Sequence, residues 1–553
     1  MPIEPNPRTI DMLIVGAGFS GLCMLHKARQ LGLSAKVVEA AAGVGGTWYH
    51  NCYPGARVDV ESMEYSFQFS EALQQEWQWT ERYSPQPELL KYANHIADRF
   101  DMRRDIELNS RVTGATFDES DQRWKIVATH GKPAAPSGGR PGQHEDVLQN
   151  WSAQFLIMAC GPLSSPNTPS FKGLETFEGP VLHTARWPHH SVDFAGQKVG
   201  VIGTGSSGVQ SIPLIAAQAS HLTVFQRTAT YVVPARNAAL DPTYVAAVKA
   251  DYVGFRARSK QMRTGFGSDF PPRDVSALEV DAQERETQLE ARWKIGGFHL
   301  LGAFRDIMTN EEANGYAAQF VRDKIQKVVK NPATAKLLLP DQIIGCKRLC
   351  VGTDYYETYN RDNVELVDVS QAPIEALTPK GLMTGGRHYA FDTLVLATGF
   401  DAMTGTLMKL DLQGLGGVSI QEKWKAGPLN YLGLTIAGFP NFFNIAGPGS
   451  TSAFTLGTLA IEHHVNWIAD CIQFMKAKNY LSAVATEEAE QAWVAYVDKA
   501  AHRSLLLGCN SWYLGANIAG KPRQFMPLAA GFPSYAKRCA EVAGKDYEGF
   551  SFT

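Results

Sequence analysis

The alternation of apolar and polar positions sets two segments of the chain apart from the rest. In the first, a short apolar run from Met12 to Val15 leads into a glycine-rich turn, and a stretch of helical periodicity follows. The turn contains Gly16, Gly18 and Gly21, and a second apolar run ends at Glu39, 18 residues after the third glycine. Such glycines allow a tight turn, close approach of a pyrophosphate and close packing of helix on strand. The segment therefore predicts a strand–helix–strand unit that binds a dinucleotide, with Glu39 at the ribose hydroxyls.

The same pattern recurs between residues 198 and 227. Its glycine-rich turn contains Gly203, Gly205 and Gly208, but the second strand ends near Arg227 and has no acidic residue there. A carboxylate would repel a 2′-phosphate, whereas an arginine can bind it through charge-assisted hydrogen bonds. The second unit therefore predicts an NADP site, and a surface arginine without a role is the alternative for Arg227. Further residues expected at this cofactor are Ser206, Ser207, Gln210 and Thr228.

Two dinucleotide sites in one chain indicate electron transfer from a nicotinamide to a flavin. Because the first site keeps its acidic residue, we assign FAD to it and NADPH to the second site. Two later apolar runs, 155–161 and 394–401, end in small residues and glycine. They resemble the strands that cross between the nucleotide domains of flavoproteins with two such domains. The FAD domain should therefore be discontinuous in sequence.

Residues 236–335 lack glycine-rich strand turns and contain helix-like stretches such as 310–330, where apolar residues recur at helical spacing. The predicted fold class is therefore α/β, with two Rossmann-like dinucleotide-binding domains, for FAD and NADP, and a helical insertion. The expected parts are 1–160 and 389–553 for the FAD domain, the latter with a mobile substrate loop, 161–235 and 336–388 for the NADP domain, and 236–335 for the insertion.

Length and charge narrow the function without changing this organisation. The chain has 553 residues, too many for one compact core, and a formal net charge of -3. This charge does not suggest a nucleic-acid partner or an anionic membrane surface. No apolar run reaches the length of a membrane span, and no basic segment followed by an apolar one begins the chain. We therefore expect a cytoplasmic protein.

Eight cysteines are scattered along the chain, at positions 23, 52, 160, 346, 350, 471, 509 and 539. No CxxC pair occurs and no cysteine–histidine cluster has zinc spacing, so no metal site is predicted. Cys346 and Cys350 are four residues apart, which is wrong for a dithiol of the thioredoxin kind. We therefore expect free, mostly buried thiols in a reducing cytosol.

Two further motifs give the reaction class by resemblance. Residues 177–188 read FEGPVLHTARWP and fit the pattern FxGxxxHxxxWP at Phe177, Gly179, His183, Trp187 and Pro188. Residues 46–59 read GTWYHNCYPGARVD and fit the pattern GxWxxxxYPGxxxD. Both patterns are those of the type I Baeyer–Villiger monooxygenases, which are class B flavoproteins. The sequence resembles this family over almost its whole length, closest to the cyclohexanone, phenylacetone and steroid monooxygenase branches.

The resemblance implies an enzyme that uses FAD, NADPH and O2 to convert a ketone to an ester or lactone through a C4a-peroxyflavin, with sulfur oxidation as a side activity. It places Arg348 beside the flavin, where a permanently protonated fork can stabilise the peroxide and the oxyanion of its ketone adduct. Asp59 would hold that guanidinium by a two-oxygen pair. A surface salt bridge is the alternative for these two residues.

Other site residues follow from the same resemblance. Those implied at the cofactors are Gly46, Thr47, Trp48, Asp59, Arg227, Thr228, Lys347 and Trp512. Trp512 matches the tryptophan of a mobile loop that closes over NADP and substrate, and an apolar loop anchor is the alternative for it. Phe454 and Met526 would line the substrate pocket beside Trp512. We give the FxGxxxHxxxWP motif a structural role between the nucleotide domains and do not expect His183 to act as an acid or base.

Three alternatives stay open at this point. Another class B flavin monooxygenase, oxidising sulfur or nitrogen, has the same two nucleotide units. An NADPH-linked disulfide reductase and a bare FAD-binding sensor are the other two, and the missing CxxC pair argues against the reductase. Residues 447–454 depart in composition from the cyclohexanone branch. The sequence therefore leaves the ketone and the oligomeric state open.

Overall fold

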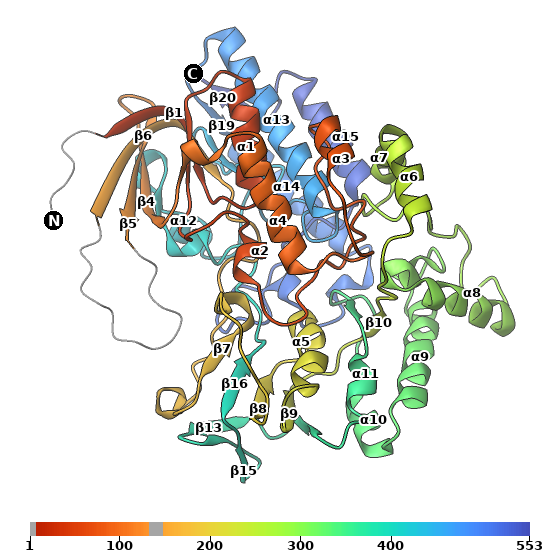
Figure 1. Cartoon of the computed structure of the whole chain (residues 1–553). Coiled ribbons are helices and arrows are strands. Elements are labelled where there is room, and N and C mark those ends of the chain that lie inside the picture. Colours follow the sequence, from red (N-terminus) through yellow and green to blue (C-terminus); the bar gives the residue numbers. More distant parts are fainter. Residues whose placement is uncertain (1–6, 132–146) are drawn as a thin grey trace.

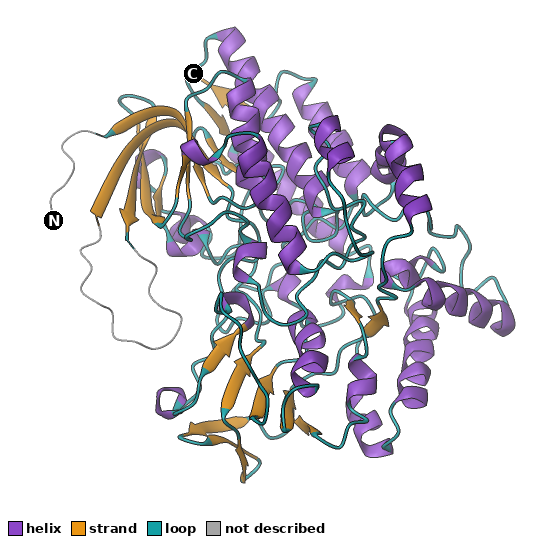
Figure 2. Ribbon diagram, in the orientation of Figure 1, coloured by secondary structure: helices purple, strands orange, loops and turns teal. Residues whose placement is uncertain are grey.

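The two nucleotide-binding units form two separate sheets in the computed structural model, which describes residues 7–131 and 147–553 (Figure 1, Figure 2). In the larger sheet, β1 (Arg8–Val15) lies between β2 (Ala35–Val38) and β6 (Val147–Met158) and runs parallel to both. Helix α1 (Phe19–Gln30) connects β1 to β2. The first predicted strand–helix–strand unit is therefore confirmed.

Segments from both ends of the chain build this layer. The strand order is β17 (Asp411–Gln413), β4 (Ser110–Asp118), β5 (Arg123–His130), β6, β1, β2 and β3 (Ile106–Glu107), with β18 (Phe442–Asn444) paired to β6. Helix α13 (Gly457–Lys478) packs beside α1 in the upper part of Figure 1. Ile14, Leu22 and Ile468 are fully buried in the core that these elements share. The C-terminal part of the chain thus returns to the sheet in which the chain begins.

The second sheet is parallel throughout. Its order is β12 (Val364–Asp368), β9 (His221–Gln226), β8 (Lys198–Ile202), β16 (Thr393–Leu396) and β7 (Val181–His183). Helix α5 (Ser206–Ala216) connects β8 to β9, so the second predicted unit is also confirmed. A small antiparallel sheet, formed by β13 (Ile374–Thr378), β14 (Gly381–Thr384) and β15 (Arg387–Ala390), lies between β12 and β16 in sequence. β16 belongs to this second sheet, which therefore extends past residue 389, where the FAD domain was expected to resume. The division of the chain into domains stays a proposal.

A group of helices separates the two parts of the second unit. It contains α6 (Pro242–Ala250), α7 (Tyr252–Gln261), α8 (Ala282–Ile295), α9 (Glu311–Val328) and α10 (Pro332–Leu338), at the right of Figure 1. The apolar stripe predicted within 310–330 forms α9, and Asn310 caps its start. Ala317, Val321 and Ile325 are buried on one face of this helix. β10 (Val232–Pro234) and β11 (Cys350–Gly352), which flank these helices in sequence, pair with each other.

The C-terminal part adds α14 (Glu487–Ala501) and α15 (Phe532–Ala543). Between them the chain forms loops and two short 3-10 helices, η7 (Leu505–Leu507) and η8 (Trp512–Leu514). Within the described residues, no helix is long and apolar enough to cross a membrane.

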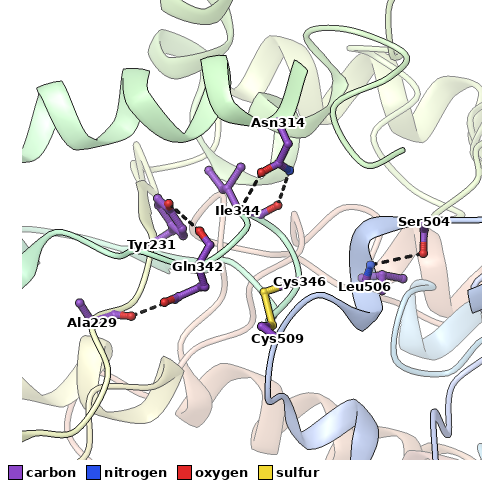
Figure 3. The surroundings of a disulfide bond; sticks show 9 residues. All are labelled: Ala229, Tyr231, Asn314, Gln342, Ile344, Cys346, Ser504, Leu506 and Cys509. Atoms are coloured by element: carbon purple, nitrogen blue, oxygen red, sulfur yellow. Dashed lines mark hydrogen bonds between the residues drawn. A yellow bond between two sulfur atoms is a disulfide. The ribbon is translucent and has the colours of Figure 1, made fainter. Parts of the chain in front are cut away.

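One expectation from the sequence is wrong, because two of the eight cysteines are not free. Cys346 and Cys509 form a disulfide, with their Cα atoms 6.0 Å apart (Figure 3). It crosslinks the segment before β11 to the loop after α14. The partners are 163 residues apart in sequence, so no local spacing could reveal the pair. The other six cysteines are free, as expected.

Candidate active site

The first glycine-rich turn has the shape needed to hold a pyrophosphate. Gly16 has a φ of +106°, and a Cβ atom on it would lie 2.9 Å from the carbonyl oxygen of Ala159. A Cβ atom on Gly21 would overlap the carbonyl oxygen of Gly16, so only glycine lets α1 pack this closely. Helix α1 begins after Gly18 with no side-chain cap. Its first backbone N–H groups therefore remain for an anion, as a bound dinucleotide requires.

The acidic residue of the first unit lies at the same turn. Glu39 follows β2 and is buried, and its carboxylate accepts hydrogen bonds from the backbone N–H groups of Ala17 and Ala41, both at 2.7 Å. In dinucleotide-binding units of this kind, an acidic residue at the end of the second strand hydrogen-bonds the ribose. Gly46 packs on this turn too, since a Cβ atom on it would lie 2.8 Å from the Cα of Gly18. The structure thus brings Glu39 and Gly46 together at the first turn.

The segment that begins with α2 (Thr47–His50) joins the first turn to the second unit. Trp48 on α2 is buried, and its indole Nε1 donates to the hydroxyl of Tyr65 at 3.3 Å. Further along, the hydroxyl of Tyr53 donates to Oε1 of Gln210 on α5 at 2.8 Å. Tyr53 of the GxWxxxxYPGxxxD motif thus contacts Gln210 of the second unit directly.

The second turn repeats the geometry of the first. Gly203 has a φ of +110°, and a Cβ atom on Gly208 would overlap its carbonyl oxygen. A Cβ atom added to Gly205 would have nothing within 4 Å, so open space faces the start of α5, which has no side-chain cap. Ser206 and Ser207 are the first residues of α5 and lie at this opening. The residues present therefore fit a second pyrophosphate.

Arg227, which follows β9, lies near enough to Lys347 to act on it electrostatically. Arg227 is exposed, and the next residue, Thr228, accepts a hydrogen bond through its carbonyl from Oγ1 of Thr204 at 3.2 Å. Burial and the nearby positive charge of Arg227 lower the pKa of Lys347. Because each positive charge disfavours the other, an anion that binds beside both relieves the repulsion.

Arg348 and Asp59 form a two-oxygen ion pair. The guanidinium donates from Nε to Oδ2 of Asp59 at 2.7 Å and from Nη2 to Oδ1 at 2.8 Å. Its Nη1 donates to the carbonyl of Ala453 at 3.0 Å, and its plane lies over the ring of Phe298 at 4.8 Å. Burial opposes the charge, but the carboxylate of Asp59 outweighs that penalty and raises the pKa of Arg348. The guanidinium is therefore charged at any working pH and held in one orientation.

The three residues predicted for the substrate pocket lie in one apolar region. The ring of Phe454 lies 4.8 Å from that of Tyr513 and stacks on that of Phe525 at 6.1 Å. Trp512 contacts the Tyr513 ring at 4.4 Å and packs against the buried Met526. The loop after α14 thus brings aromatic side chains and Met526 to the same side of the molecule as Phe454.

His183 of the FxGxxxHxxxWP motif lies where the two units are connected. Its Nδ1 accepts from the backbone N–H of Ala185 at 3.0 Å. Its Nε2 therefore carries the proton and lies 3.2 Å from both the carbonyl of Asn167 and Oγ1 of Thr398. Burial lowers the pKa of His183, so the ring is neutral at pH 7. The other motif residues, Phe177, Gly179, Trp187 and Pro188, include two buried aromatic rings.

The sequence did not single out two contacts of this site. Phe298 belongs to η4 (Gly297–Gly302) of the insertion, and no motif distinguished its ring from the other aromatic residues there. Lys521 lies in the loop after α14, and its Nζ donates to Oδ1 of Asp401 at 2.6 Å. Asp401 is the last residue of the apolar run 394–401, which the sequence marks as a crossing strand. The position of that run was therefore the signal that could have indicated this contact.

Comparison with known proteins agrees with these features. A family model described as NAD(P)-binding Rossmann-like domain matches residues 14–77. The Baeyer-Villiger monooxygenase of Pseudooceanicola batsensis is 40% identical, over 98% of this chain and 97% of that protein. The solved structure of an oxidized steroid monooxygenase bound to NADP is 49% identical, with a TM-score of 0.90, over 98% of this chain and 99% of that one. The solved complex of OTEMO with FAD and NADP is 35% identical, with a TM-score of 0.91, over 99% and 100%.

The fold and the site define an oxidoreductase with two dinucleotide-binding units. The chain belongs to the Baeyer–Villiger monooxygenases. The resemblance seen in the sequence is confirmed, and with it the reaction class.

Proposed function

We propose that FAD binds at the first glycine-rich turn, that NADPH binds at the second, and that a ketone is oxygenated beside Arg348. The observation that carries the proposal is the bidentate pair of Arg348 with Asp59, a fixed cation next to the segment that joins the two units. When bound, FAD supplies the activation of O2, which no protein side chain provides. The chain itself supplies position, charge and the exclusion of water.

Arg348 keeps donors free for the reaction. A guanidinium has five N–H groups, and hydrogen bonds to Asp59 and Ala453 use three of them. The remaining N–H groups can donate to a negative charge that develops on the substrate oxygen. Because the ion pair and the ring of Phe298 hold the plane of the guanidinium, little reorganisation is needed when that charge forms.

The two cations beyond β9 select the nicotinamide cofactor. Arg227 and Lys347 would hold the 2′-phosphate of NADPH, which NADH lacks, and Thr228 would lie beside it. The lowered pKa of Lys347 supports this role, because the electrostatic conflict with Arg227 is relieved when a phosphate binds between them.

The substrate is a hydrophobic ketone. The rings of Phe454, Tyr513 and Phe525 and the side chains of Trp512 and Met526 make the region apolar. Because a steroid monooxygenase is a relative with 49% identity, a steroid ketone is the first candidate. Soft sulfides should be oxidised at the same site as a side activity.

The expected cytoplasmic location and the expected absence of a nucleic-acid partner stay predictions.

The test is product analysis with the purified protein. It should be yellow, and acid denaturation should release FAD from the polypeptide. With NADPH and O2, a panel of cyclic, aryl, linear and steroid ketones should yield an ester or lactone carrying one added oxygen atom. Oxygenation of sulfides or amines without any ketone product would point to another kind of class B monooxygenase. NADPH oxidation without O2 uptake would remove the proposal.

A further inference from the structure

A disulfide lies where two segments of the site meet. Cys346 comes directly before Lys347 and Arg348, and Cys509 comes three residues before Trp512. The disulfide, drawn in Figure 3, therefore joins the segment of Lys347 and Arg348 to the loop that carries Trp512. None of the steps proposed above uses either cysteine.

On one side of the disulfide, the chain is fixed to the helical insertion. The buried side chain of Asn314 on α9 accepts from the backbone N–H of Ile344 at 3.1 Å and donates to its carbonyl at 2.9 Å (Figure 3). The hydroxyl of Tyr231 donates to the carbonyl of Gln342 at 2.9 Å. Cys346 itself is completely buried. It is therefore a fixed anchor.

On the other side, the chain is the long connection between α14 and α15. Its start is held where the N–H of Leu505 donates to the carbonyl of Met308 at 2.9 Å. Its later part is held where Nζ of Lys521 donates to Oδ1 of Asp401 at 2.6 Å. Trp512 thus lies between a covalent tether at Cys509 and a series of polar contacts, of which the nearest are the carbonyl of Tyr513, which accepts from the N–H of Met526 at 2.9 Å, and Nδ2 of Asn517, which donates to the carbonyl of Phe400 at 2.7 Å. Polar contacts exchange readily, whereas the covalent tether is released only by reduction.

The disulfide can be reached from one side. Cys509 is partly exposed and lies between two exposed residues, whereas Cys346 is buried. A thiolate would therefore attack Sγ of Cys509 and release the thiolate of Cys346, which takes up a proton. The second thiol of a dithiol then attacks the mixed disulfide, so that two protein thiols and one oxidised dithiol result. In a reducing compartment, disulfides are typically transient and redox-sensing.

We propose that Cys346–Cys509 is a redox modification site, acted on by a dithiol reductant, that controls how far the Trp512 loop can open. In the disulfide form, the loop stays against the segment of Lys347 and Arg348. In the dithiol form, the segment from Cys509 to Trp512 is released from the segment of Lys347 and Arg348, and the enzyme retains NADP more weakly. This consequence for NADP rests on the proposed cofactor site, whereas the release of the loop does not.

The first experiment counts thiols in the full-length protein. Under denaturing conditions, a thiol reagent should detect six cysteines before reduction and all eight after it, as the free cysteines and the disulfide require. Detection of eight before reduction would overturn the proposal.

The second experiment follows the loop directly. Trypsin should cut the native protein faster after Arg503 and Arg523, which are exposed in this loop, once dithiothreitol has reduced the disulfide. Cys509→Ser should be cut at the fast rate with or without dithiothreitol, which excludes effects at the other thiols. Ser504→Ala, in the same loop, keeps both cysteines and should respond to dithiothreitol as the wild type does. Equal cleavage of oxidised wild type and Cys509→Ser would overturn the proposal.

The third experiment measures NADP+ binding by calorimetry with the FAD-loaded enzyme. Reduction of the wild type, or Cys509→Ser, should raise the Kd about five- to tenfold, a typical coupling between two linked sites, and reoxidation should restore it. If thiol counts and cleavage change as expected but no ketone is oxygenated, the proposed function fails and the modification site stands. If ketones are oxygenated and none of the three measurements responds to reduction, the modification site fails alone.

Discussion

Asp59→Asn separates the position of the catalytic cation from its presence. The variant keeps the shape of the side chain but loses the carboxylate, whose two oxygens accept hydrogen bonds from Arg348 at 2.7 and 2.8 Å. The Asp59 and Arg348 side chains are 24% and 29% exposed, so water screens the pair only in part. Hydrogen bonds to charged groups contribute about 1.5–3 kcal/mol. Loss of one such contribution predicts a fall in kcat of about 10- to 100-fold, because the guanidinium is no longer held in one orientation.

The assay is steady-state ester formation together with flavin content and the KM for NADPH. We expect kcat to fall while flavin content and KM stay close to wild type, and Asp59→Glu to restore part of the rate. Glu61→Gln is the matched control, since Glu61 pairs with Arg82 at 2.6 Å and not with Arg348. A rate for Asp59→Asn equal to that of the control would refute the positioning role of Asp59.

Three further predictions concern charge. Arg227→Ala should raise the KM for NADPH by about 10- to 100-fold, because a lost phosphate contact costs about 1.5–3 kcal/mol, with little effect on NADH; an unchanged ratio of the two KM values would contradict this. Because its pKa is lowered, Lys347 loses its charge below the usual pH range of lysine, and NADPH affinity should fall as pH rises through that pKa. Lys347→Arg should remove this fall, and titration of KM against pH decides. Burial raises the pKa of Glu64 from 4.5 to about 8, so stability should decline as pH rises through this window, and Glu64→Gln should flatten the decline in chemical denaturation.

The local parts of the site could be predicted from the sequence. The turns at Gly16 and Gly203 depend on residues a few positions apart, and their positive φ angles and tight contacts require glycine. The apolar stripe within residues 310–330 predicted α9, because it too depends on residues a few positions apart. Such patterns are visible because strand and helix periodicity is a property of neighbouring residues.

Contacts between distant segments could not be derived in this way. Asp59 and Arg348 are 289 residues apart, and only the family resemblance suggested that they meet. The Cys346–Cys509 disulfide and the ring of Phe298 beneath Arg348 carry no spacing signal at all. Their partners are set by tertiary packing, which a single sequence does not encode in any short pattern.

Ester formation by Arg348→Ala tests most directly whether this guanidinium stabilises the reacting oxygen. We expect the rate of ester formation to fall by about 10²–10³, as is typical when a preorganised donor is removed. Flavin content should persist, because the glycine-rich turns are unchanged, and Arg348→Lys should rescue poorly, since a point charge cannot replace the planar fork. Ester formation by Arg348→Ala at a rate near wild type would contradict this role of Arg348 and make Lys347 the next candidate for the catalytic cation.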